Sequence, residues 1–65
     1  MKLIINGERQ DVSSLTLDAL LEELAYDHEF LATARNNELV AAEDRTRCRL
    51  AEGDRIEILS PMQGG

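Results

Sequence analysis

The chain has 65 residues, of which 43% are hydrophobic, 7 are Lys or Arg and 13 are Asp or Glu, so its formal net charge is −6 at pH 7. This length allows one small domain, and the hydrophobic fraction is too ordinary for a disordered chain. The acidic balance argues against nucleic acid and an anionic membrane surface as partners, because both are bound mainly through basic side chains.

A single cysteine, Cys48, excludes an internal disulfide and fits a reducing compartment. Together with the one histidine, His28, it supplies too few ligands for a structural zinc site, so we expect no bound metal. The N-terminus enters a strand-like run at once, without a signal sequence, and no apolar run approaches membrane-spanning length. We therefore expect a cytoplasmic protein with no membrane partner.

The first residues predict a β-hairpin. Residues 2–5 are rich in leucine and isoleucine, which is typical of a strand. Asn6-Gly7 follows, and both residues tolerate the positive φ that a tight type I′ turn requires. Residues 8–12 should return as the second strand.

A leucine stripe predicts one amphipathic helix. Thr16 is placed to cap it, because a threonine hydroxyl accepts a hydrogen bond from a backbone N–H of the first turn. The spacing i, i+3, i+4, i+7 puts four leucines on one face, and these are Leu17, Leu20, Leu21 and Leu24. We expect the helix to end within residues 25–28.

Three further strands are predicted in the second half of the chain, at residues 30–35, 38–40 and 55–59. The pair Asn36-Asn37 is typical of a turn and separates the first two of these strands. Residues 41–50 are polar and weakly patterned, which indicates a loop with a single helical turn.

The order of strand, strand, helix, strand, strand, strand predicts an α+β domain over residues 1–59. A mixed sheet of about five strands would pack on the one main helix. The last strand would lie in the middle of the sheet, beside the first strand and parallel to it. This placement would explain why both strands are so apolar at Leu3, Ile5, Ile56 and Ile58.

Residues 60–65 predict a flexible C-terminal tail. Pro61 cannot donate to a β-ladder, and neither Met62 nor Gln63 indicates further packing. Gly64 and Gly65 lack Cβ, so they fit a channel too narrow for other residues and present an unhindered α-carboxylate. The alternative is an ordinary frayed end. The position of residues 60–65 directly after a strongly apolar strand favours a functional tail.

In their order and spacing, these motifs resemble the ThiS family of ubiquitin-like, β-grasp sulfur carriers. The resemblance runs along the whole chain, through residues 4–8, 16–24, 36–40 and 52–58 to Gly64-Gly65. The chain departs from the family pattern at Arg35, where an aliphatic residue is common. It also departs at Ala41-Ala42, where a proline and a basic residue are common.

The resemblance implies a specific chemistry at the tail. In this family a ThiF-like adenylyltransferase uses ATP and magnesium to adenylate the terminal glycine. A persulfide donor, such as a cysteine desulfurase, then supplies the sulfur of a C-terminal thiocarboxylate. That thiocarboxylate donates sulfur to a ThiG-like thiazole synthase in thiamine biosynthesis. The chain itself would have no catalytic group and bind no cofactor.

By the same resemblance, each residue of the tail has an implied role. Gly65 would be the site of covalent modification. The residues that precede it would form the segment inserted into the partner's active site, and these are Gly64, Gln63, Met62 and Pro61.

Strand alternation predicts where a partner docks. If Ile56 and Ile58 face the helix, then Glu57 and Leu59 face outward near the tail, and Ile4 does so on the first strand. Ile4 and Leu59 would then form a small apolar patch rimmed by acids, which suits a docking site. The alternative is that exposed single aliphatic residues are ordinary on protein surfaces.

Three interpretations of function remain open from the sequence. The first is the thiamine sulfur carrier. The second is a related carrier, such as the small subunit of molybdopterin synthase. The third is a β-grasp interaction module that binds without covalent chemistry. Cys48 could serve as a persulfide relay, although a packing thiol is the preferred interpretation.

Overall fold

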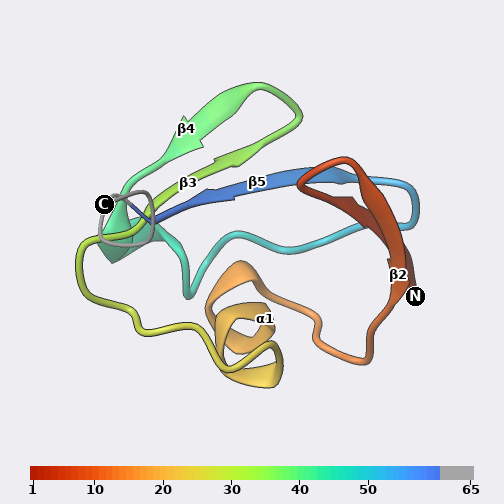
Figure 1. Cartoon of the computed structure of the whole chain (residues 1–65), viewed down its shortest axis with the longest axis horizontal. Helices are drawn as coiled ribbons and strands as arrows, with labels where there is room; N and C mark the ends of the chain where they lie inside the picture. The colour runs from red at the N-terminus through yellow and green to blue at the C-terminus, as the bar shows by residue number, and fades with distance from the viewer. Residues whose placement is uncertain (61–65) are drawn as a thin grey trace.

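A five-stranded sheet and one α-helix form the fold, which the computed structural model describes over residues 1–60 (Figure 1). The elements are β1 (Lys2–Ile5), β2 (Glu8–Asp11), α1 (Leu17–Glu23), β3 (Ala32–Arg35), β4 (Glu38–Val40), the 3-10 turn η1 (Ala42–Asp44) and β5 (Arg55–Leu59). Within this described range no helix has the length and hydrophobicity that a membrane span needs. The predicted α+β, β-grasp class is confirmed.

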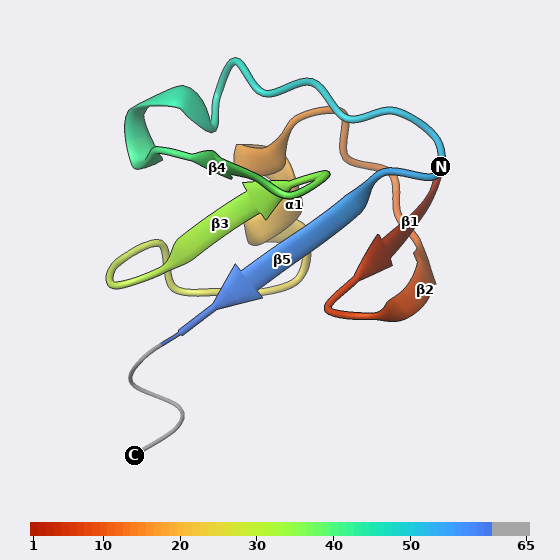
Figure 2. The same cartoon turned by 90° about the horizontal axis from the view of Figure 1, so that it is seen from above.

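The last strand occupies the centre of the sheet, as predicted. The strand order is β2-β1-β5-β3-β4, and Figure 2 shows β5 between β1 and β3. β5 runs parallel to β1, with Ile56 in register with Ile5, and antiparallel to β3, with Ile58 in register with Thr33. The two hairpins, β1–β2 and β3–β4, are therefore joined only through β5.

The core lies between the sheet and α1 (Figure 1). Along β5 the burial alternates strictly, so the even-numbered residues point toward α1 and the odd-numbered residues toward solvent. Thr16 caps the helix by accepting a hydrogen bond from the Ala19 N–H at 3.2 Å. The buried apolar side chains are Leu3, Ile5, Val12, Leu17, Leu20, Leu21, Leu50, Ile56 and Ile58.

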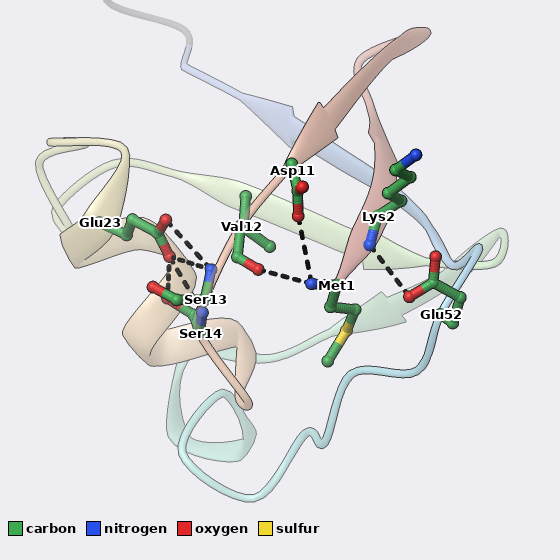
Figure 3. Close-up of polar contacts among 8 residues, drawn as sticks. All are labelled: Met1, Lys2, Asp11, Val12, Ser13, Ser14, Glu23 and Glu52. Atoms are coloured by element: carbon green, nitrogen blue, oxygen red, sulfur yellow. Dashed lines mark hydrogen bonds and ion pairs between the residues drawn. The ribbon is translucent and has the colours of Figure 1, made fainter.

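Polar contacts fasten the N-terminal strand at its first residues (Figure 3). The amino group of Met1 donates to Val12 O at 2.9 Å and to Asp11 Oδ1 at 3.2 Å. The Lys2 N–H donates to Glu52 Oε1 at 3.1 Å. These contacts tie the start of β1 both to the end of β2 and to the turn that precedes β5.

A carboxylate of the last helical turn fastens the connection between the first hairpin and α1 (Figure 3). Glu23 accepts hydrogen bonds from the Ser14 hydroxyl and from the backbone N–H groups of Ser13 and Ser14. These bonds, led by the one from the Ser14 hydroxyl, lower the pKa of Glu23. The helix itself is shorter than predicted and ends at Glu23, because Ala25 adopts a positive φ of 62°.

The third strand begins two residues later than predicted, so the expected start at Phe30 is wrong. Phe30 has a positive φ of 60°, which excludes it from a strand. The cause is Arg45, which is buried and donates to the carbonyl oxygens of His28 and Leu31 and to the hydroxyl of Thr33. These contacts hold residues 28–31 as a loop rather than as an extension of β3.

Candidate functional site

The candidate site is the end of β5, where the C-terminal segment begins. β5 ends at Leu59, and Ser60 is the last described residue. Five residues with predicted roles lie outside the described part of the chain, namely Pro61, Met62, Gln63, Gly64 and Gly65. Their roles, and the division into residues 1–59 and 60–65, therefore stay predictions.

An apolar surface surrounds this exit on the sheet face that points away from α1. Leu59 is in register with Ala32, and Ala34 is in register with both Glu57 and Leu39. Leu59 is 63% exposed and Leu39 is 86% exposed, and both line one hollow, so they form a contiguous apolar surface and not single exposed residues. We call these residues the outer patch: Ala32, Ala34, Leu39, Glu57 and Leu59.

The structure brings two of the three predicted docking residues together and separates the third. Glu57 and Leu59 both lie in the outer patch and line one shallow hollow. Ile4 points to the same sheet face but is in register with Arg55, at the opposite end of β5. Arg55 and Leu59 are four steps apart along an extended strand, which is about 13 Å, so Ile4 and Leu59 do not form one patch.

Three residues of the outer patch were not predicted from the sequence, namely Ala32, Ala34 and Leu39. The signal that could have found them is the same alternation used for β5, applied to β3 and β4 once the pairing of β3 with β5 is known. Alanine opposite an exposed leucine also leaves the leucine side chain uncovered, because alanine is short. The patch is therefore made by three strands and not by one.

The opposite end of β5 is fixed by a buried carboxylate. Asp54 accepts hydrogen bonds from Arg35 Nε at 2.7 Å, Ala51 N at 2.8 Å and Asn36 Nδ2 at 3.0 Å. Burial by itself raises the pKa of Asp54, but the hydrogen bonds from Arg35, Asn36 and Ala51 outweigh it and lower the pKa. Arg35, one of the departures from the family pattern, thus has a structural partner.

Known proteins share this architecture, and the family match includes the C-terminal segment. The model of the ThiS family matches residues 3–65, which is nearly the whole chain. The chain belongs to the ThiS family. Its structure is similar to the crystal structure of the thiamine biosynthesis protein ThiS from Geobacter metallireducens, with a TM-score of 0.85, 29% identity and 100% of each chain covered.

A second structure of that protein and one further relative are also similar to this ThiS-family chain. The solution structure of the Geobacter metallireducens protein gives a TM-score of 0.82 at 29% identity, covering 100% of this chain and 88% of that one. A thiazole synthase from Paramagnetospirillum magneticum is 41% identical over 66 residues. The match takes in 100% of this chain but only 20% of that enzyme, so the chain spans one fifth of that relative's length.

The one cysteine of this ThiS-family chain is a packing residue. Cys48 is half-buried and packs against the hydrophobic core, and its carbonyl oxygen accepts from the Leu17 N–H at 2.9 Å. Burial raises the pKa of the Cys48 thiol, and the opposing effect of Arg35 is smaller. A thiol with a raised pKa is a poor nucleophile at neutral pH. This environment supports packing rather than persulfide relay.

Replacing this thiol should therefore not affect the sulfur transfer that the resemblance to the family implies. We expect Cys48→Ala to form the C-terminal thiocarboxylate at a rate within about twofold of the wild type, because a packing thiol takes no part in nucleophilic steps. The measurement is the fraction of thiocarboxylate against time by mass spectrometry. A loss of transfer by this variant without a loss of folded protein would instead identify Cys48 as a relay.

Proposed function

We propose that this chain is a sulfur carrier protein of thiamine biosynthesis, which acts in the cytoplasm as a protein cosubstrate and not as an enzyme. The observation that carries the proposal is the match to the ThiS family over residues 3–65, which includes Gly64 and Gly65. The similarity to a thiamine biosynthesis protein over the whole length of both chains supports the same assignment.

The chemistry follows from the weakness of a carboxylate as an electrophile. The Gly65 carboxylate attacks the α-phosphorus of ATP on the activating enzyme, which gives an acyl adenylate and pyrophosphate. The terminal sulfur of a persulfide then attacks the acyl carbon and AMP leaves. A thiol cleaves the resulting acyl disulfide, which leaves a thiocarboxylate on Gly65 and a disulfide between the donor sulfur and that thiol. The magnesium and ATP belong to the activating enzyme.

Three partners follow from this scheme. The thiazole synthase of Paramagnetospirillum magneticum contains, within one polypeptide, a region 41% identical to this chain. Joining two activities in one chain raises their effective concentration, which supports a ThiG-like thiazole synthase as the acceptor of the sulfur. The second partner is a ThiF-like adenylyltransferase, and a persulfide donor such as a cysteine desulfurase supplies the sulfur.

Intact-mass measurement of the protein from its own cells tests the proposal. Exchange of oxygen for sulfur adds about 16 Da, nearly the same as oxidation of Met62, so fragmentation has to place the gain C-terminal to that residue. Sulfur on Gly65 would establish a carrier. A terminus that stays unmodified after incubation with ATP, the cognate activating enzyme and a sulfur source would exclude one and favour an interaction module.

A growth test then assigns the pathway. A strain that lacks this chain should need thiamine, and the preformed thiazole moiety should restore its growth, because only thiazole formation consumes the carried sulfur. A strain that grows without thiamine but lacks molybdopterin would assign the chain to the related molybdopterin pathway.

The outer patch is the surface we propose for docking on the adenylyltransferase. Leu59→Glu places a charge at the centre of an apolar contact, next to Glu57, and should raise KM for the carrier about tenfold or more, because desolvating an unpaired charge is costly. Leu59 is 63% exposed and lies outside the hydrophobic core, so the fold should be unchanged. The measurement is ATP–pyrophosphate exchange against carrier concentration.

Leu15→Glu is the matched control for this experiment. Leu15 lies before α1 rather than on the outer face of the sheet, and its exposure of 60% is close to the 63% of Leu59. The two variants therefore add the same charge at equally exposed leucines. An equal effect of both on KM would mean that net charge matters and that the outer patch does not.

A further inference from the structure

The central strand β5 extends beyond the end of β1, so its C-terminal end lacks backbone partners on that side. The backbone groups of Ile56 and Ile58 that face β1 need partners, but β1 ends at Ile5. The last backbone bond between the two strands runs from the Asn6 N–H to Ile56 O at 2.9 Å. Asn6 then adopts a φ of 50°, which turns the chain away from β5 and into the hairpin loop.

The side chain of Asn6 takes over where its backbone leaves. Asn6 Oδ1 accepts from the Ile58 N–H at 2.8 Å, and Asn6 Nδ2 donates to Ile58 O at 3.1 Å. A carboxamide offers the same donor and acceptor pair as a peptide group, so it continues the ladder by one more pair of bonds. We call these two hydrogen bonds the amide clamp, and they join residues 52 positions apart in the chain.

We propose that Asn6 is a positioning residue of the carrier, whose amide clamp fixes the end of β5 and thereby the direction in which the C-terminal segment leaves the domain. The inference rests on the proposed function, because it concerns delivery of that segment to the activating enzyme. The clamp acts one residue before Leu59 and two before Ser60. It thus lies beside the outer patch as well as at the exit.

The place of the amide clamp explains why its loss should affect the end of β5 more than the loss of another hydrogen bond would. On its other side, the end of β5 is held by β3, with Ala32 in register with Leu59. Without the clamp, the strand end would be paired on one side only, as in an edge strand. A carrier whose exit points in many directions binds with lower apparent affinity, because only the fraction with the correct direction is competent.

The chain contains a matched control at the other end of the same strand. Asn36 also lies in a hairpin turn and also has a φ of 50°. Its Oδ1 accepts from the Arg55 N–H at 2.9 Å, and its Nδ2 donates to Asp54 Oδ1 at 3.0 Å. Asn36 thus makes two side-chain hydrogen bonds to the start of β5, as Asn6 makes two to its end.

Glycine is the suitable replacement at both positions, because it accepts a positive φ without strain and removes only the amide. We expect Asn6→Gly to raise KM for the carrier in ATP–pyrophosphate exchange about tenfold, with kcat within about twofold, because loss of the two bonds lowers the competent fraction. Asn36→Gly should leave KM unchanged. In Asn6→Gly the Ile58 amide proton should also exchange faster with solvent than in Asn36→Gly.

Two results would contradict the positioning role of Asn6, and a third would contradict the proposed function on which that role rests. Equal KM values for the two glycine variants would mean that Asn6 contributes stability alone. Unchanged protection of the Ile58 amide in Asn6→Gly would mean that the clamp does not hold the strand end. A wild-type chain that is never adenylated would overturn the proposed function and with it the positioning role, whatever the exchange of Ile58 shows.

Discussion

Deleting Gly65 should abolish thiocarboxylate formation and leave the domain over residues 1–59 folded as in the wild type. The α-carboxylate would then belong to Gly64 and end about 3.5 Å short of its place in the activating site. Because a misplacement of 1 Å already costs on the order of a hundredfold in rate, we expect a loss of more than about a hundredfold. ATP–pyrophosphate exchange measures the activation, and circular dichroism with thermal unfolding measures the fold.

Gln63→Ala is the control that keeps the length of the tail. It removes an amide but leaves Gly64, Gly65 and the number of residues after Leu59 unchanged, so its rate should fall much less than that of the deletion. The comparison separates tail length from tail composition. If the shortened chain still binds its partner and supports thiamine synthesis, covalent chemistry at the terminus is excluded and a non-covalent interaction module takes its place.

The sequence predicted the elements whose signal is local. The alternation in residues 55–59, the leucine stripe of α1 and the Asn6-Gly7 turn each depend on neighbours within a few positions. The structure confirms the alternation, the turn and the stripe as far as Leu21, and Leu24 is the residue at which α1 is capped. The parallel pairing of β1 with β5 was also predicted, because the apolar residues Leu3, Ile5, Ile56 and Ile58 indicated two neighbouring strands in the middle of the sheet.

Two features depend on contacts between residues that are far apart in the chain, and the sequence did not predict them. The side chain of Arg45 is buried among the carbonyl oxygens of residues 28–31, and this contact replaces the first two residues of the predicted third strand by a loop. Similarly, Ile4 and Leu59 alternate outward as expected, but their separation depends on the register of β1 with β5. Local patterns carry no information about register between distant strands.

The second large expected effect is on stability and concerns Asp54. Replacing it with asparagine keeps its size but leaves one amide oxygen to serve three donors, from Arg35, Asn36 and Ala51. Removing one partner of a buried ion pair costs about 3–5 kcal/mol, and Arg35 is partly exposed, so we expect Asp54→Asn to lose about 2 kcal/mol in the free energy of unfolding. Urea denaturation at pH 7 measures this loss.

Asp44→Asn is the matched control for the charge change. Asp44 also pairs with an arginine, Arg47, at 2.8 Å, but both side chains are largely exposed. Exposed ion pairs contribute little, because water screens them and ordering two long side chains costs entropy. We therefore expect little change in the free energy of unfolding. A similar loss in both variants would mean that net charge, and not the buried site of Asp54, is responsible.

The pH dependence of stability distinguishes the carboxylate of Asp54 from a merely well-packed side chain. Its pKa is lowered in the folded state, so the unfolded chain binds a proton more readily than the folded chain does. The stabilisation is therefore complete above the unfolded pKa of about 3.9 and is lost as the pH falls through that value toward the folded pKa.

The difference in the free energy of unfolding between wild type and Asp54→Asn should accordingly be largest near neutral pH and shrink below about pH 4. The exposed Glu23 also has a lowered pKa, but it is present in both proteins and cancels in the difference. A difference that stays constant from neutral to acidic pH would assign the loss to packing of the amide rather than to the charge of Asp54.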